Sequence, residues 1–376
     1  MNVLVCAGEA SGDAYGADLI REMKAAATES HVYYAVGGVR LKASGAQLIA
    51  DSSTWGVISI TQSLRAYPRI ALSYFRIRQF IQNTPPGLFI PIDFGFANIR
   101  LAKLAKAKGW KVLYFIPPGS WRRDKQGADL PAVTDAIVTP FPWSAEILNR
   151  MGANAHFFGH PIKQALRGSL AADTAIPFPA DGKTFRLAVL PGSRNHEIAE
   201  HVPIVAKTLP LLNQPNMEVT FALAPGADVD AFRRRWESLT GRTGDTIAVG
   251  RASQVLRSAS AAIVCSGTAT LEAALCRVPL VLIYEISPVM KVEAKIIGFK
   301  RPKFIGLPNI LLDREIVPEM VEENASPEKI AAAIRAVVSD GGVQQAAFDE
   351  LEHLLGPEDA ITQTAAFALQ LMKVSP

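Results

Sequence analysis

The sequence predicts an α/β protein with two consecutive domains, each built around a parallel sheet. The chain has 376 residues, more than a single hydrophobic core usually serves, since such cores stop growing near about 250–300 residues. Short apolar runs alternate with helical patterns, which is typical of parallel α/β units. This alternation lapses near residues 160–184 into a stretch rich in Gly, Pro and Asp, where we place the linker.

The apolar runs are the expected strands, because each is short and bounded by residues that end regular structure. In the first domain they are Asn2–Ala7, His31–Val36, Gly87–Ile92, Lys111–Ile116, Ala136–Thr139 and Asn154–Phe158. In the second they are Phe185–Leu190, Glu218–Ala222, Thr246–Val249, Ala261–Cys265 and Pro279–Tyr284. We therefore predict domains at residues 1–162 and 163–340, followed by C-terminal helices at 341–376, one of which can cross back over the first domain.

Composition excludes several classes of protein. Hydrophobic residues make up 49% of the chain and charged residues 20%, which rules out wholesale disorder. A formal net charge of +4 is too weak to indicate a nucleic-acid partner. Cys6, Cys265 and Cys276 lack metal-type spacing and are expected to be buried thiols of a reducing compartment. With no signal peptide and no spanning run of about 18–20 apolar residues, we expect a cytoplasmic protein.

The first loop follows the first predicted strand and precedes a helical pattern. Its glycines, Gly8 and Gly12, are not spaced as in the nicotinamide-binding G-x-G-x-x-G motif, so that cofactor is not supported. Glu9, Ser11 and Asp13 offer hydrogen bonds to ligand hydroxyls. Ser11 or Asp13 could equally cap the helix. Ligand contact and capping both remain open for this loop.

A second candidate is Asp93, which follows the apolar run 88–92. A carboxylate at a strand tip can be partly desolvated, which raises its pKa toward the range that a general base needs. The same residue could also cap a helix from Phe96 onward. General base and helix cap are the two interpretations.

The second domain offers two loops suited to a diphosphate. Residues 191–197 combine a predicted helix N-terminus with Arg194, although no P-loop Gly-Lys-Ser/Thr follows. We expect His196 and His201 to be helix-surface histidines, because their spacing is not that of a zinc motif, and we predict no metal. Residues 266–272 form a second phosphate-friendly nest. Glu272 could reach a ribose diol, or it could simply be an acid that the helix dipole favours in the first turn.

Six motifs occur along the chain in a recognisable order. They are Gly8-Glu9-Ala10-Ser11-Gly12-Asp13, Ile92-Asp93, Phe158-Gly159-His160-Pro161, Leu190-Pro191-Gly192-Ser193-Arg194, Ser266-Gly267-Thr268-Ala269-Thr270-Leu271-Glu272 and Leu307-Pro308-Asn309. As a set, these motifs resemble the lipid-A-disaccharide synthase family over nearly the whole chain. The resemblance implies a GT-B glycosyltransferase with two Rossmann-like domains, needing no metal and no cofactor.

The resemblance also implies substrates and roles. The donor would be UDP-2,3-diacylglucosamine, the acceptor 2,3-diacylglucosamine 1-phosphate, and the products a β-1,6-linked disaccharide 1-phosphate and UDP, with inversion at the anomeric carbon. Asp93 and Arg194 are the expected catalytic residues. Donor binding is expected at Gly192, Ser193, Arg194, Ser266, Gly267, Thr268, Ala269, Thr270, Glu272 and Asn309, and acceptor binding at Gly8, Glu9, Ser11, Gly12, Asp13 and Asn98.

Two segments on the acceptor side depart from the family pattern. The family usually continues after its aspartate with Ala-Pro-Asp-Phe-Asn, where this chain has residues 94–98, Phe-Gly-Phe-Ala-Asn. The family's Ser-Pro-x-x-Trp-Ala-Trp corresponds to residues 116–123, which hold one tryptophan, Trp121. Acceptor identity and acyl-chain length are therefore not decided by the sequence. The alternatives are a diverged member that uses another lipid acceptor and a non-catalytic nucleotide-sugar or lipid-binding protein.

A basic, apolar stretch predicts contact with a membrane. Between Trp55 and Ile81 there are four arginines and no acidic residue. Apolar residues beside these arginines could dock on anionic headgroups, whereas a solvated basic face is the alternative. The basic surface could extend to Lys291, Lys295, Lys300, Arg301 and Lys303. We expect a peripheral protein on the inner face of the cytoplasmic membrane; a homodimer is compatible with the sequence.

Overall fold

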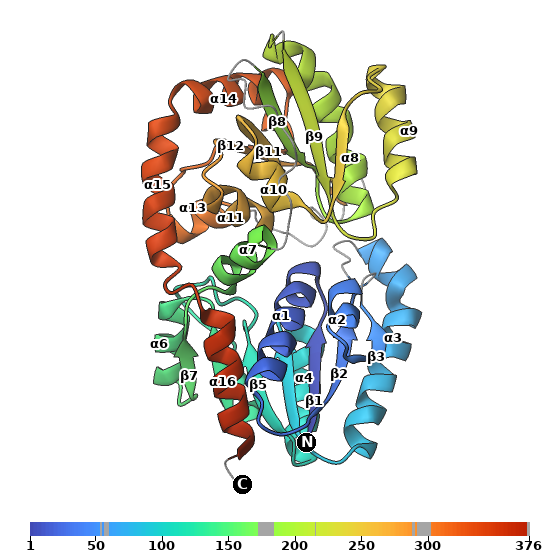
Figure 1. Ribbon diagram of the computed structural model, residues 1–376, viewed down its shortest axis with the longest axis vertical. Helices are drawn as coiled ribbons and strands as arrows, with labels where there is room; N and C mark the ends of the chain where they lie inside the picture. The colour runs from blue at the N-terminus through green and yellow to red at the C-terminus, as the bar shows by residue number, and fades with distance from the viewer. Residues whose placement is uncertain are drawn as a thin grey trace. The chain divides into compact units, whose positions relative to one another are not determined.

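The computed structural model describes residues 1–52, 55, 60–171, 184–214, 216–287, 290, 291 and 302–373, apart from the side chains of 60–69, 96, 169–171 and 341. The chain divides into two compact units. The first comprises Met1–Ala165 together with Leu354–Pro376, and the second comprises Leu166–His353. Each unit is a parallel sheet with helices packed against it (Figure 1).

Within the described residues, the first unit has a seven-stranded sheet in the order β3-β2-β1-β4-β5-β6-β7, and all its pairings are parallel. The strands are β1 (Asn2–Ala7), β2 (Val32–Gly37), β3 (Gln47–Asp51), β4 (Leu88–Ile92), β5 (Lys111–Phe115), β6 (Ala136–Thr139) and β7 (Ala155–Phe157). The helices are α1 (Ala10–Ala26), α2 (Val39–Ala43), α3 (Ile60–Asn83), α4 (Gly95–Ala107), α5 (Leu130–Val133), α6 (Pro142–Arg150) and α16 (Ala360–Lys373), with α7 (Pro161–Ala171) at the boundary. The strand order reverses between β1 and β4, and ligands of open α/β sheets bind at such a switch point.

The second unit repeats this plan in its described residues, with a six-stranded parallel sheet in the order β10-β9-β8-β11-β12-β13. Its strands are β8 (Phe185–Leu190), β9 (Met217–Leu223), β10 (Thr246–Val249), β11 (Ala261–Cys265), β12 (Leu280–Tyr284) and β13 (Glu319–Val321). Its helices are α8 (Asn195–Thr208), α9 (Val229–Thr240), α10 (Ala252–Arg257), α11 (Thr268–Leu275), α13 (Leu307–Leu312), α14 (Pro327–Ser339) and α15 (Gly341–Leu354). The switch point here lies between β8 and β11.

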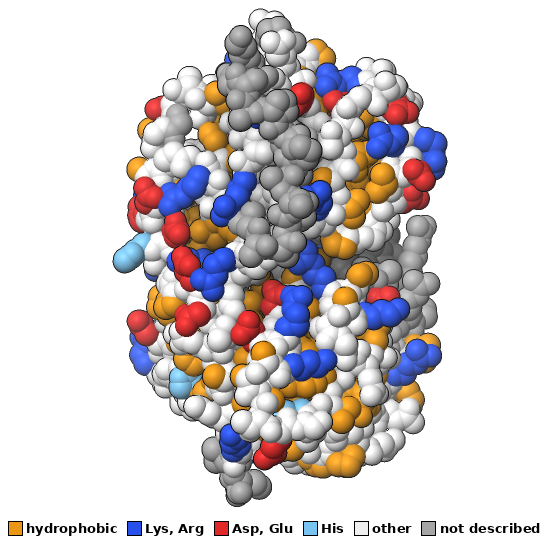
Figure 2. All heavy atoms as spheres, viewed as in Figure 1, with side chains coloured by type: hydrophobic (Ala, Val, Ile, Leu, Met, Phe, Trp, Pro, Cys, Tyr) orange, Lys and Arg blue, Asp and Glu red, His pale blue; other side chains and the backbone are white. Residues whose placement is uncertain are grey.

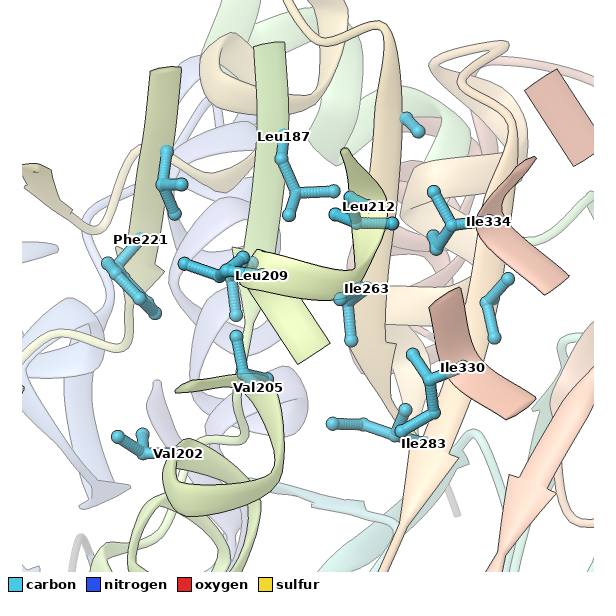
Figure 3. Packing of buried hydrophobic residues seen from close by; sticks show 14 of the residues in the cluster. Leu187, Val202, Val205, Leu209, Leu212, Phe221, Ile263, Ile283, Ile330 and Ile334 are labelled. Carbon is cyan, nitrogen blue, oxygen red and sulfur yellow. The ribbon is translucent and has the colours of Figure 1, made fainter. Parts of the chain in front are cut away.

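The core of the second unit explains why its strands read as continuous apolar runs. Strand residues such as Leu187 and Ile263 are fully or almost fully buried, and they pack with Val205 from α8 and Ile330 from α14 (Figure 3). Because helices cover the sheet, the strands need no polar face. Acidic and basic side chains are instead interspersed over the surface seen in Figure 2, consistent with the formal net charge of +4.

The last two helices belong to different units. In the second unit, Arg277 forms ion pairs with Asp349 and Glu352 of α15. In the first unit, α16 packs on α1, and the Thr362 hydroxyl donates a hydrogen bond to Glu22 at 3.0 Å. The boundary that we placed at residue 340 therefore differs from the observed division, because specific side-chain bonds keep α15 with the second sheet. None of the helices in the described ranges is long and apolar enough to span a membrane.

Candidate functional site

Asp93 lies at the switch point of the first sheet, directly after β4. Asp93 and Phe94 both adopt left-handed backbone conformations, with φ of 46° and 51°. Two bonds from the β5 side hold this turn: the Asp93 amide donates to the Ile116 carbonyl at 3.1 Å, and the Tyr114 hydroxyl donates to the Asp93 carbonyl at 2.8 Å. The backbone is therefore held in a turn that aspartate tolerates better than bulky residues do.

The carboxyl group of Asp93 has an unusual proton affinity. Its pKa is raised from 3.8 to about 6, mainly by burial and also by the negative charge of Glu9, while a hydrogen bond from the Phe94 amide acts in the opposite direction. Glu9 is exposed at the N-cap position of α1. A carboxylate with a pKa near 6 is largely ionised at neutral pH and is still a useful proton acceptor.

Asn98 supports this turn from behind. Its side chain is fully buried, and its amide nitrogen donates to the carbonyls of Cys6 and Ile92 at 3.2 Å and of Asp93 at 2.9 Å. Its amide oxygen finds no hydrogen-bond partner among the described residues. The amide thus ties the end of β1 to the end of β4, which is a supporting position for Asp93 rather than the direct acceptor contact that we predicted.

Asp13 also has a structural role where we predicted an acceptor contact. Its carboxylate is buried and accepts hydrogen bonds from the amides of Gly38 at 2.6 Å, Arg40 at 3.0 Å and Leu41 at 3.1 Å. These amides form the N-terminus of α2, so the aspartate caps a neighbouring helix and not its own. Both carboxylate oxygens of Asp13 are thus engaged in holding α2.

The rest of the first loop lies at the end of β1. Gly8 approaches Phe94 so closely that a Cβ atom there would lie 2.3 Å from the ring, and this ring also packs on Trp55 with 5.5 Å between centroids. Ser11 is partly exposed in the first turn of α1. Gly12 is buried beside Ala7, and a Cβ added there would lie 3.2 Å from the Ala7 Cβ, a milder clash than the one at Gly8. Gly8 and Glu9 therefore border the turn at Asp93 and Phe94, at the switch point.

In the second unit, the loop between β8 and α8 is organised around Glu197. The amides of Ser193 and Arg194 donate to Glu197 Oε2 at 2.8 and 3.1 Å, and the Arg194 guanidinium donates to Oε1 at 2.8 Å. Gly192 has φ of 126°, a conformation that favours glycine. Our prediction that these loop amides face a diphosphate is therefore wrong for residues 193 and 194, because an internal carboxylate accepts both.

His201 is not the surface residue that we predicted. Its side chain is fully buried, with Nδ1 2.8 Å from the Pro191 carbonyl and Nε2 3.0 Å from the Glu285 amide. Burial lowers the pKa of this imidazole. A neutral ring that donates from Nδ1 and accepts at Nε2 satisfies both contacts. His196 is half-buried, and burial lowers its pKa too.

The loop between β11 and α11 is more open. Gly267 has φ of 142° and is exposed, and a Cβ added there would meet nothing within 4 Å. Thr268 and Ala269 are partly exposed beside it, so the start of α11 has room for a ligand. Thr270 is buried, and its hydroxyl donates to the Gly267 carbonyl at 2.8 Å.

Two polar residues at the edges of this loop have protein partners. The Ser266 hydroxyl donates to the Ile305 carbonyl at 3.0 Å. Glu272 is partly exposed one turn into α11, and its Oε1 accepts a hydrogen bond from the Ser253 hydroxyl at 2.7 Å. The Glu272 carboxylate is thus oriented by the Ser253 hydroxyl.

Asn309 has a saturated side chain. It is fully buried; its amide nitrogen donates to the Val317 carbonyl at 2.7 Å and to Glu319 at 2.8 Å, and its oxygen accepts from the amides of Ile316 and Val317 at 2.8 and 2.9 Å. An amide group offers two donors and two acceptor sites, and all four are in use. We predicted a donor contact here, but the side chain instead holds the segment that leads into β13.

Sequence reasoning missed the roles of Glu197, His201 and Glu319. Glu197 could have been recognised, because an acid three residues after an N-cap is the pattern of a capping box. The other two lie in no capping pattern, since their partners are ten or more residues away. No group of three or more His, Cys, Asp or Glu side chains suited to a metal ion occurs in the part of the chain that the structure describes.

Comparison with known proteins identifies the family. The family model described as lipid-A-disaccharide synthetase matches residues 3–369. The chain belongs to this family. It is therefore a glycosyltransferase of lipid A biosynthesis, and membership implies a nucleotide-sugar donor and a lipid acceptor.

Individual relatives agree with this assignment. The lipid-A-disaccharide synthase of Trichlorobacter lovleyi is 31% identical over 99% of this chain and 98% of its own length. That of Neisseria gonorrhoeae is 33% identical over 88% of this chain and 86% of its own. The chain thus matches lipid-A-disaccharide synthases along nearly their whole length.

Solved structures establish the fold class. A UDP-GlcNAc 2-epimerase from Neisseria meningitidis bound to UDP-GlcNAc has a TM-score of 0.64 at 13% identity, covering 98% of this chain and 100% of that one. The glycotransferase of kitacinnamycin has a TM-score of 0.62 at 14% identity, covering 99% of each chain. At such identities the likeness concerns the fold alone, and it confirms the predicted pair of Rossmann-like domains of the GT-B type.

Proposed function

We propose that this lipid-A-disaccharide synthase family member transfers 2,3-diacylglucosamine from its UDP derivative to 2,3-diacylglucosamine 1-phosphate. The products are a β-1,6-linked disaccharide 1-phosphate and UDP. The observation that carries the proposal is Asp93, an acid with a raised pKa at the switch point of the first sheet. Family membership supplies the substrate class, and Asp93 supplies the proton acceptor that the reaction needs.

In this mechanism Asp93 is the general base. Its carboxylate removes the proton from the acceptor's 6-hydroxyl while that oxygen attacks the anomeric carbon of the donor from the face opposite UDP. The bond to the UDP oxygen breaks as the new glycosidic bond forms, which inverts the configuration. The transition state has oxocarbenium character at the anomeric carbon. The proton of the attacking 6-hydroxyl becomes acidic as its oxygen bonds to that carbon, and this is when the base removes it.

The second unit would hold the leaving group. Arg194, the N-cap residue of α8 with a quarter of its side chain exposed, would offset the charge that develops on the diphosphate. The exposed backbone of Gly267 at the start of α11 offers a second anion contact, and Glu272 is the candidate for the ribose.

The test is release of UDP from the diacylated donor with a panel of acceptors. We expect turnover with 2,3-diacylglucosamine 1-phosphate, loss of at least about a hundredfold in kcat for Asp93→Asn, and a native-like fold of that variant by circular dichroism. Turnover only with a different lipid acceptor would assign the chain to a diverged activity. UDP release that is equally negligible in wild type and variant would indicate a binding protein.

We also propose that the outer face of α3 docks on anionic membranes. Leu72 and Phe75 are 54% and 60% exposed, whereas Ile77 on the opposite side of the helix is fully buried. Arg76 and Arg78 are exposed beside them. Exposed apolar groups flanked by arginines suit an interface with acidic headgroups.

Other parts of the predicted basic surface contribute less. Lys291 is paired with Glu285, and Lys303 lies 3.6 Å from Asp313, so each has an acidic neighbour. Lys295, Lys300 and Arg301, like the side chains of Arg65 and Arg69, lie outside the described residues. The proposal for the membrane therefore depends on the exposed part of α3.

Sedimentation with vesicles tests this surface. With vesicles of phosphatidylglycerol and phosphatidylethanolamine we expect the double variant Leu72→Ser/Phe75→Ser to bind about tenfold more weakly than wild type. The matched control, Leu239→Ser/Val343→Ser, removes exposed apolar residues of the second unit and should bind like wild type. Equal binding of both variants would contradict the proposal.

A further inference from the structure

Glu197 occupies the place in the β8–α8 loop where an anion would be expected. Only 6% of the residue is exposed. Its Oε2 accepts from the amides of Ser193 at 2.8 Å and Arg194 at 3.1 Å, while its Oε1 accepts from the Arg194 guanidinium at 2.8 Å. Loop amides and arginines at helix N-termini commonly bind phosphate groups. Here a carboxylate of the protein itself takes these bonds.

The loop is built tightly around this carboxylate. A Cβ at Gly192 would lie 2.5 Å from Glu197 Cβ and 2.6 Å from Oε2, so the backbone passes directly over the side chain. Further along α8, buried His201 binds the Pro191 carbonyl at 2.8 Å and accepts from the Glu285 amide at 3.0 Å. The loop is thus anchored both at its start and through Glu197, which restricts the ways in which Arg194 can move.

The pair also faces the neighbouring strand ends. Burial raises the pKa of Tyr284, the last residue of β12, to about 12, and the charges of Glu197 and Arg194 act on it in opposite directions. The same two charges act on Cys265, the last residue of β11, whose thiol pKa burial raises. The ion pair therefore lies near the carboxyl ends of β11 and β12, where open α/β sheets bind ligands.

We infer that Glu197 is a positioning residue that holds the Arg194 guanidinium in the orientation used by the diphosphate leaving group. This inference rests on the proposed function, since it assumes a UDP-sugar donor. Glu197 acts through Arg194 and does not touch the nucleotide. A carboxylate that instead competed with the diphosphate for the arginine would have the opposite effect on affinity, which makes the two roles separable.

The variant Glu197→Gln separates the two tasks of this side chain. Its amide oxygen can still accept from the amides of Ser193 and Arg194, but its NH₂ group cannot accept from the guanidinium. The loop keeps its support while Arg194 loses this one carboxylate acceptor. Isothermal titration with UDP should show about tenfold weaker binding than in wild type, and kcat should fall more than KM changes. Thermal unfolding of the variant should remain a single step near that of wild type.

A double-mutant cycle shows whether the effect passes through Arg194. In an Arg194→Ala background, Glu197→Gln should cause no further weakening of UDP binding. Glu200→Gln is the control, because it removes a charge from the same helix at a residue other than the acceptor of the Ser193 and Arg194 bonds, and it should bind UDP like wild type. Glu197→Asp keeps the carboxylate on a side chain that is one methylene shorter, and this variant should bind UDP more weakly than wild type.

The outcomes are distinct. Weaker binding that disappears in the Arg194→Ala background supports the inference. Tighter or unchanged UDP binding in Glu197→Gln, or an effect that persists without Arg194, overturns it. If wild type binds UDP but transfers sugar to none of the lipid acceptors, the proposed acceptor is overturned. The inference about Glu197 is then still decided by the UDP-binding titrations. Wild type that does not bind UDP would overturn both.

Discussion

Replacing Asp93 by asparagine is expected to stabilise the protein at alkaline pH. The folded pKa of about 6 lies above the ordinary value of 3.8, so the folded state holds this proton more tightly than the unfolded chain does. Such a group contributes stability that is fully present below its unfolded pKa and is lost as pH rises through the folded pKa. A difference of about 2 units corresponds to roughly 3 kcal/mol at pH 8. Asparagine is uncharged and also tolerates the left-handed backbone at this position.

The assay is urea unfolding of wild type and Asp93→Asn at pH 4.5 and pH 8. Trp55, Trp110, Trp121 and Trp143 all lie in the first unit, so tryptophan fluorescence mainly follows the unfolding of the part that contains Asp93. The advantage of the variant in free energy of unfolding should grow by about 2 kcal/mol between the two pH values. An advantage that does not change with pH, or greater stability of wild type at pH 8, would refute a desolvated carboxylate at the strand tip.

Three further outcomes follow from the same geometry. The kcat/KM of wild type should rise as pH increases through about 6 and then level off, because Asp93 must lose its proton to act as a base; a fall across this range would exclude that role. Asp13→Ala should lower the free energy of unfolding by about 2–3 kcal/mol by leaving three amides of α2 without their acceptor, and chemical denaturation that detects no loss would contradict the cap. Asn309→Ala should lower the free energy of unfolding by about 2–4 kcal/mol, because four hydrogen bonds of the side chain are lost. The folded variant should bind UDP with nearly unchanged affinity in titration calorimetry. A selective loss of affinity would instead mean that the side chain contacts the donor.

Much of the fold could be predicted from local sequence. Buried parallel strands are continuous apolar runs, and every run that we expected to be a strand overlaps an observed one. The two strands that we missed, β3 and β13, are short and lie at sheet edges. β3 has only one buried residue, Ala50, and β13 has only Val321 buried, so neither carries the apolar pattern. The edge strands β7 and β10 also have one buried residue each, yet their runs were recognised, so little burial makes an edge strand harder to recognise without hiding it.

The positions of the loops were also predictable, because glycine-containing turns and polar residues follow the strands at their carboxyl ends. Asp93 was found in this way. The sequence alone therefore determined that the chain has two α/β units with polar loops at the strand ends, since strand length, apolar runs and loop composition are local properties.

Only the tertiary structure decided what each polar side chain does. Asp13 and Glu9 look equally suited to a ligand in the sequence, yet the first caps α2, twenty-five residues away, and the second faces Asp93 closely enough to raise its pKa. Asn309 and the amides of Ser193 and Arg194 likewise meet protein groups where a nucleotide contact was expected. Hydrogen bonds and charge interactions depend on distances between atoms, and those distances are set by the packing of segments that the sequence does not place side by side.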